Sequence, residues 1–253
     1  MSGKTVLVTG GSRGVGRGIA ERFLAAGADV VICGRKVPEK PPEACGRTAH
    51  FIAADVREID QVDALVTGTT DRTGRLDVLV NNAGGAPAVD AATVSPRFHE
   101  SIIRLNLVAP LHCAQRANAV MQTQDAGGVI INISSVSGIR PSPGTAAYGA
   151  AKAGLLSLTQ TLAVEWAPKV RIVAVTAGMV RTEQSELHYG DEAGIAAVGA
   201  TVPLGRIAEP SDVGDACLFL ASPLARYVSG TRLLVHGGGE KPTFLDAAKN
   251  TKS

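Results

Sequence analysis

The chain has 253 residues, of which 45% are hydrophobic and 19% are charged, which is enough for one domain with a large core. Lysine and arginine total 25 against 23 aspartates and glutamates, and this balance of +2 excludes the basic footprint of a nucleic-acid-binding protein. The four cysteines form no CxxC pair and the five histidines show no ligand spacing, so no metal site is expected. No apolar run approaches the ~20 residues of a membrane helix. A cytoplasmic protein without a membrane partner is expected.

Short apolar runs alternate with longer helical stretches along the chain. Parallel neighbours need crossover helices, and strands buried on both faces read as continuous apolar runs. The pattern therefore predicts an α/β fold in a single domain over residues 1–253, a doubly wound three-layer sandwich around a seven-stranded parallel sheet. The expected strands are 5–8, 30–33, 50–53, 78–80, 129–133, 171–175 and 233–235.

Two segments depart from this alternation. Pro38, Pro41 and Pro42 disfavour a helix between the second and third strands, so a loop is expected there. Residues 183–203 are rich in small residues and have no strong periodicity, and we expect them to form a weakly helical substrate lid within the domain.

The first strand runs into a glycine-rich turn, residues 9–16 (TGGSRGVG), which is followed by a helix. Glycines let the backbone approach a ligand closely, and the unpaired amides at a helix start attract an anion. The turn therefore predicts a phosphate-binding site. The motif alone leaves open an ordinary glycine-rich turn between a strand and a helix.

Tyr148 and Lys152 are four positions apart, which places both side chains on one helix face. A tyrosine needs a nearby cation to exchange a proton near neutral pH, because lowering its pKa from ~10 by ~3 units takes about 4 kcal/mol. Lys152 together with an oxidised nicotinamide would supply that interaction. Ser135 follows the strand 129–133 and belongs to the same edge of the sheet, where ligand chemistry is expected. An isolated pair of this kind would most often be an ordinary surface tyrosine and lysine.

Together these residues resemble the short-chain dehydrogenase/reductase family, in its single-domain form of about this length. The resemblance covers nearly the whole chain and implies a Rossmann-type fold. It also implies hydride transfer between a nicotinamide dinucleotide and a small-molecule carbonyl or alcohol, and a homotetramer or homodimer. The motifs that carry it are the turn 9–16, Asp55-Val56, Asn81-Asn82-Ala83-Gly84, Asn106, Ser134-Ser135, Tyr148-x-x-x-Lys152 and the segment 202–206 (VPLGR).

The resemblance assigns four catalytic residues. Tyr148 would be the general acid in reduction and the base in oxidation, and Lys152 would hold the nicotinamide ribose and lower the pKa of Tyr148. Ser135 would hydrogen-bond the substrate oxygen, and Asn106 would support a water-mediated proton path.

The resemblance also assigns cofactor contacts. Asp55 would meet the adenine and Thr182 the carboxamide, whereas Thr176-Ala177-Gly178 departs from the usual Pro-Gly on the nicotinamide side. The full expected set is Gly10, Ser12, Arg13, Gly14, Val15, Gly16, Arg35, Asp55, Val56, Asn82, Ala83, Gly84, Tyr148, Lys152, Gly178, Val180 and Thr182.

The end of the second strand indicates which cofactor is bound. An NAD site places a carboxylate there, whereas a 2′-phosphate is recognised by arginine. This chain has Gly34 at that position, followed by Arg35 and Lys36, and Arg13 lies in the glycine-rich turn. NADP(H) is therefore favoured over NAD(H), with solvated side chains at 35 and 36 as the alternative.

The leading hypothesis is an NADP(H)-dependent oxidoreductase that interconverts a ketone and a secondary alcohol. One alternative is a 3-oxoacyl-thioester reductase, because residues 203–206 resemble that part of the fatty-acid-synthesis reductases. Another is a cofactor-binding regulator without turnover, against which the intact catalytic set argues. Few aromatic residues in 86–97, 137–145 and 183–203 suggest a roomy, aliphatic pocket for a substrate that the sequence does not identify.

Overall fold

A seven-stranded parallel sheet forms the centre of the protein, in the strand order β5-β2-β1-β6-β7-β8-β9. The computed structural model describes residues 1–242 and 244, apart from the side chains at 187 and 188. The predicted α/β sandwich is confirmed, with each expected strand within one or two residues of its observed bounds. The strands are β1 (Thr5–Thr9), β2 (Asp29–Gly34), β5 (His50–Ala53), β6 (Val78–Asn81), β7 (Gly128–Ser135), β8 (Val170–Ala177) and β9 (Arg232–Val235).

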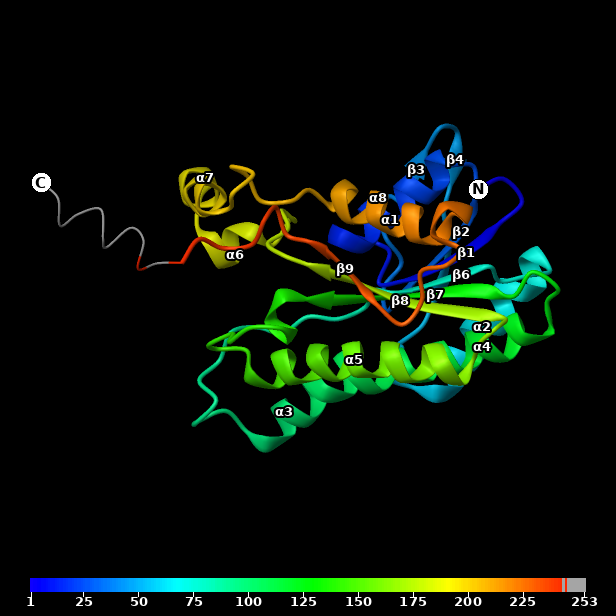
Figure 1. Ribbon diagram of the computed structural model, residues 1–253, viewed down its shortest axis with the longest axis horizontal. Coiled ribbons are helices and arrows are strands. Elements are labelled where there is room, and N and C mark those ends of the chain that lie inside the picture. The colour runs from blue at the N-terminus through cyan, green and yellow to red at the C-terminus, as the bar shows by residue number, and fades with distance from the viewer. Residues whose placement is uncertain (243, 245–253) are drawn as a thin grey trace, which may run out of the picture.

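Helices cover both faces of the sheet (Figure 1). On one face α1 (Gly14–Ala25) packs against α8 (Pro210–Ala221). On the other lie α2 (Ile59–Thr73), α4 (Ala109–Thr123) and α5 (Ala146–Glu165). All five side chains of β1 are buried, because its successive residues point into the two different cores.

The chain between β2 and β5 contains no helix, as its prolines predict. It instead forms a small antiparallel hairpin of β3 (Glu43–Ala44) and β4 (Arg47–Thr48). The two turn residues, Cys45 and Gly46, have φ values of 50° and 73°. Positive φ at both central positions is what a two-residue hairpin turn requires.

The segment predicted as a lid contains two helices, α6 (Ser185–Tyr189) and α7 (Glu192–Thr201). Both lie beyond the carboxyl ends of the strands, to the left in Figure 1. Below the sheet in that view, α3 (Pro96–Ile103) packs against α5. None of the helices in the described part of the chain has the length and hydrophobicity of a membrane span.

Candidate active site

The predicted catalytic residues meet at the carboxyl edge of the sheet. Ser135 is the last residue of β7 and pairs in register with Ala177, the last residue of β8. Tyr148 lies in the first turn of α5 and is partly buried. Burial of the phenol raises the pKa of Tyr148, whereas a hydrogen bond with the Ser135 side chain acts in the opposite direction. The structure thus places the serine side chain next to the tyrosine hydroxyl.

Lys152 lies one helical turn further along α5, and its side chain is enclosed by protein, with a relative exposure of 3%. Its Nζ donates a hydrogen bond of 2.8 Å to the carbonyl oxygen of Ile133 and lies 5.5 Å from the centroid of the Tyr148 ring. Burial lowers the pKa of Lys152 from 10.5 to about 8. The ammonium group therefore remains mostly protonated at neutral pH beside the tyrosine.

Asn106 is completely buried in a five-residue π-helical segment, Arg104–Val108, between α3 and α4. Its Nδ2 donates to the carbonyl oxygens of Gly85 and Ile102, each at 3.0 Å, and its Oδ1 accepts from the Gly85 N–H at 2.8 Å. Short π-helical turns within helices are frequent at functional sites. Here the turn fixes Asn106 against the chain that follows β6. The amide side chain is engaged by backbone groups.

Gly84 lies where Asn106 and Lys152 approach each other. A Cβ atom at this position would be 2.6 Å from Oδ1 of Asn106 and 3.3 Å from Nζ of Lys152. The lack of a side chain at residue 84 therefore lets both polar groups approach this position.

The glycine-rich turn is clamped to the end of β6. Thr9 Oγ1 accepts hydrogen bonds from the backbone N–H groups of Asn82 and Ala83, each at 3.0 Å, and Asn82 Nδ2 donates to Thr9 O at 2.9 Å. A Cβ on Gly16 would lie 2.3 Å from the Gly10 carbonyl oxygen, so only glycine fits there. The predicted turn and Asn82-Ala83 thus form one unit.

The outer side of this turn fits an anionic ligand. The N-cap residue of α1, Arg13, makes no side-chain cap, and the first turn of α1 carries no acidic residue. Ser12 Oγ is buried and has no hydrogen-bond partner among the described residues. It lies 3.4 Å from where a Cβ of Gly34 would be, at the end of β2. The amides at the start of α1, the Ser12 hydroxyl and the adjacent glycines suit the phosphates of a dinucleotide.

Asp55 is paired with a residue that the sequence analysis missed. Both carboxylate oxygens of Asp55 accept hydrogen bonds from the Arg57 guanidinium, at 2.9 and 2.5 Å. This pair lowers the pKa of Asp55, and the positive charge of Arg35 lowers it further. Val56 between them is buried. The spacing of two along the chain was the available signal for Arg57, but it does not distinguish this pair from two solvated side chains.

The nicotinamide side of the predicted site lies near the start of the lid segment. A Cβ on Gly178 would lie 2.8 Å from that of His236, and Val180 forms a parallel bridge with Ala208. The methyl group of Thr182 lies 3.4 Å from where a Cβ of Gly14 would be. The structure thus places Thr182 next to the glycine-rich turn.

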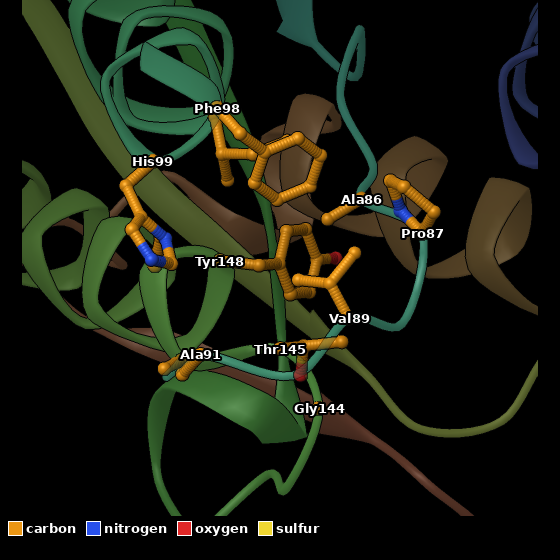
Figure 2. A pocket seen from close by; sticks show the side chains of 12 residues that line it. Ala86, Pro87, Val89, Ala91, Phe98, His99, Gly144, Thr145 and Tyr148 are labelled. Atoms are coloured by element: carbon orange, nitrogen blue, oxygen red, sulfur yellow. The ribbon is translucent and has the colours of Figure 1, made fainter. Parts of the chain in front are cut away.

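A hollow lies beside the Tyr148 ring (Figure 2). Figure 2 shows the Phe98 ring on one side of the tyrosine and Val89 on the other. His99 also lines the hollow, and the Phe98 and His99 rings are edge to face with centroids 6.0 Å apart. The lining is mostly small and apolar, but these two rings from α3 make it less aliphatic than the sequence predicts. With a volume of about 10 Å³, the hollow is also smaller than the roomy pocket that the sequence predicts.

Known proteins are similar to this chain in both sequence and fold. A family model described as enoyl-(acyl carrier protein) reductase matches residues 10–240. The chain is 38% identical to 3beta-hydroxysteroid dehydrogenase 1 of Eggerthella lenta, over 94% of each chain. It is 34% identical to a 3-oxoacyl-[acyl-carrier-protein] reductase of Vibrio harveyi, over 94% of this chain and 98% of that protein. The structure of an aldohexose dehydrogenase of Thermoplasma acidophilum superposes with a TM-score of 0.85 at 33% identity, covering 93% of each chain.

The parallel sheet and the relatives that match nearly the whole chain define an oxidoreductase that acts on CH–OH or C=O groups with a nicotinamide cofactor. The chain belongs to the short-chain dehydrogenase/reductase family.

Proposed function

We propose that the protein is an NADP(H)-dependent oxidoreductase that interconverts a ketone and a secondary alcohol, with Ser135, Tyr148 and Lys152 as its catalytic residues. The observation that carries this proposal is the placement of Tyr148, whose hydroxyl lies next to the Ser135 side chain and whose ring lies beside the buried ammonium group of Lys152. A small-molecule carbonyl compound or alcohol is the substrate.

In reduction, the bound cofactor supplies the hydride that adds to the carbonyl carbon. Tyr148 donates its hydroxyl proton to the carbonyl oxygen, and Ser135 hydrogen-bonds that oxygen as negative charge develops on it. Lys152 stabilises the tyrosinate that results and holds the nicotinamide ribose. Asn106, which is fixed against Gly85, supports the path by which Tyr148 is reprotonated from water.

The preference for NADP(H) over NAD(H) rests on charge and space at the end of β2. Gly34 lies beside Ser12 Oγ, which has no hydrogen-bond partner among the described residues, and Arg13 and Arg35 are both exposed there. The nearby acid, Asp55, is already engaged by Arg57. A 2′-phosphate would therefore meet two arginines and a free hydroxyl.

The remaining cofactor contacts are also proposed at the carboxyl edge of the sheet. The turn residues would bind the diphosphate, the chain after β6 would hold the ribose, and Thr182 would bind the carboxamide. The proposed set is Gly10, Ser12, Arg13, Gly14, Val15, Gly16, Arg35, Asp55, Val56, Asn82, Ala83, Gly84, Tyr148, Lys152, Gly178, Val180 and Thr182.

The lining of the hollow beside Tyr148 supports a ketone with an apolar carbon skeleton. Thr145, a polar residue of this lining, already bonds Ser142 Oγ at 2.7 Å. A polyhydroxylated substrate would leave several hydroxyl groups unpaired against Phe98, Val89 and their neighbours, which is costly. Steroid dehydrogenases are among the relatives of this chain, as are a sugar dehydrogenase and a thioester reductase.

The lid, the assembly and the cellular location follow the expectations for the family. Residues 183–203 cover the substrate, and the protein is a cytoplasmic homotetramer or homodimer. Support for assembly comes from α5, where Val164 has a relative exposure of 81%. An apolar side chain so exposed on a long helix fits an interface between copies.

The experiment that tests the function follows NADPH and NADH consumption over a panel of alicyclic ketones, steroids, sugars and 3-oxoacyl thioesters. The Tyr148→Phe variant is the blank. Turnover of apolar ketones with NADPH above this blank is expected. Turnover equal to the blank for every substrate, with NADPH still bound, would contradict the proposed activity and favour a protein that only senses the cofactor.

A further inference from the structure

Glu183 occupies the start of α1, where an anionic ligand would bind. Its two carboxylate oxygens accept hydrogen bonds from the Gly14 backbone N–H at 3.3 and 3.1 Å, although the two residues are 169 positions apart in the sequence. Gly14 is the first residue of α1. The unpaired amides and the macrodipole of a helix favour negative charge at this end. A carboxylate from a distant segment thus takes the position of an anion at the glycine-rich turn.

The start of α1 has no local residue for this role. α3 and α7 are capped by the side chains of Ser95 and Asp191, respectively. The corresponding residue of α1 is Arg13, which makes no cap. The buried Ser12 Oγ in the same turn also has no partner among the described residues. The Gly14 N–H and Ser12 Oγ therefore both depend on partners from outside α1. Glu183 is the partner of the Gly14 N–H.

Glu183 is held in place by a compact turn at the start of the lid segment. Ser185 is buried, its Oγ accepts a hydrogen bond of 2.8 Å from the Thr182 N–H, and its own N–H donates to Thr182 O at 3.0 Å. Thr182 itself approaches Gly14 closely. An anion that takes the place of Glu183 at Gly14 must therefore move the Glu183 carboxylate away from the start of α1.

We propose that Glu183 is a residue that sets the affinity of the cofactor site, because its carboxylate competes with the cofactor diphosphate for the Gly14 N–H. This inference rests on the diphosphate position given under Proposed function. A site that is free for only part of the time binds its ligand more weakly, in proportion to the free fraction. The contact also joins the start of the lid segment to the cofactor turn, so that dinucleotide binding frees the Glu183 side chain from the turn.

The test measures the binding of ADP, which carries the diphosphate but no nicotinamide, by isothermal titration calorimetry. Glu183→Gln and Glu183→Ala should each bind ADP about three- to tenfold more tightly than the wild type, corresponding to about 0.7–1.4 kcal/mol. Glu186→Gln is the matched control, since it removes the same charge from the exposed side of α6. Its affinity for ADP should equal that of the wild type.

A second readout needs no ligand. Amide hydrogen exchange in the peptides that span Gly14 and residues 182–190 should be faster in Glu183→Ala, which has no acceptor for the Gly14 N–H, than in the wild type or Glu186→Gln. Equal ADP affinity in Glu183→Gln and the wild type, weaker binding by the variant, or unchanged exchange at Gly14 would each overturn the competition. Failure of ADP to bind the wild type would instead show that the diphosphate position is wrong, and the inference would fall with it.

Discussion

Lys152 and Tyr148 lie on one face of α5, with the lysine Nζ 5.5 Å from the centroid of the tyrosine ring. The same Nζ donates a hydrogen bond to the Ile133 carbonyl oxygen. The lysine is thereby anchored to the end of β7, the strand that also carries Ser135. Helix spacing brings the two side chains together, and the backbone of the sheet fixes the cation.

Replacing Tyr148 with phenylalanine should abolish turnover and leave cofactor binding nearly unchanged. The substitution removes only the hydroxyl group, so the proton donor is lost while the packing of the ring is kept. We expect kcat to fall by a factor of about 10² to 10⁴, which is the usual contribution of a general acid. NADPH titration should give a Kd within a few-fold of the wild type. Substantial residual turnover would show that another group delivers the proton.

Burial of Lys152 makes protein stability depend on pH. Its pKa is about 8 in the folded protein and 10.5 as the ordinary value. Below pH 8 both states carry the charge, and the folded state bears the full cost of burying it. Between pH 8 and 10.5 the unfolded state binds more protons, so this cost decreases as the pH rises. The gain between pH 7 and 9.5 should be about 2 kcal/mol.

Comparison with Lys152→Met isolates this contribution. The buried thiols of Cys33, Cys113 and Cys217 have raised pKa values and give a slope of the opposite sign, but they are common to both proteins. Urea denaturation at pH 7 and pH 9.5 should show the wild type gaining stability relative to the variant. A stability difference that is the same at both pH values would mean that the lysine titrates normally in the folded protein.

Much of the site follows from the order of elements along the chain. β-branched runs identify the strands, and parallel strands bring their carboxyl ends to one edge, so Ser135 and Tyr148 are predicted to be neighbours before any coordinates are known. The glycine-rich turn, residues 9–16, is likewise recognisable in the sequence as a motif.

Contacts between residues distant in the sequence have no such signal. Glu183 reaches Gly14 only because the segment after β8 returns over the start of α1, and no periodicity encodes that path. The π-helical turn at Asn106 is also invisible, since Arg104–Val108 reads as ordinary helix. The β3–β4 hairpin depends on two turn residues with positive φ, one of which is a cysteine rather than a usual turn former.

Arg35→Ala should weaken NADPH binding far more than NADH binding. A charge-assisted hydrogen bond contributes about 1.5–3 kcal/mol, so we expect a loss of roughly tenfold or more for NADPH. Fluorescence titration with both cofactors measures the ratio. Arg97→Ala, which removes an exposed arginine from α3, is the control and should affect neither cofactor. Equal weakening of both cofactors by Arg35→Ala would show that this arginine does not read the 2′-phosphate.

Gly16→Ala should destabilise the glycine-rich turn. The added Cβ would lie 2.3 Å from Gly10 O and 2.4 Å from Asn82 Nδ2, so the clamp between β1 and β6 must shift. We expect a loss of about 1–3 kcal/mol of unfolding free energy, together with weaker ADP binding. Gly68→Ala is the matched control, since its Cβ would meet only the end of the Ile52 side chain at 3.3 Å. Higher helix propensity should leave Gly68→Ala as stable as the wild type or more so. Equal melting temperatures for the two variants would contradict the clamp.

Val164→Asp should break the proposed assembly along α5. The valine is 81% exposed, so the aspartate costs little in a single chain, whereas an interface between copies would bury a charge from each partner. Light scattering coupled to size-exclusion chromatography should show the wild type as a tetramer or dimer and the variant as a smaller species. Val37→Asp is the control, because Val37 is 76% exposed in the loop after β2 and should not change the mass. A monomeric wild type would refute the assembly itself, and a variant that keeps the wild-type mass would place the interface away from this face of α5.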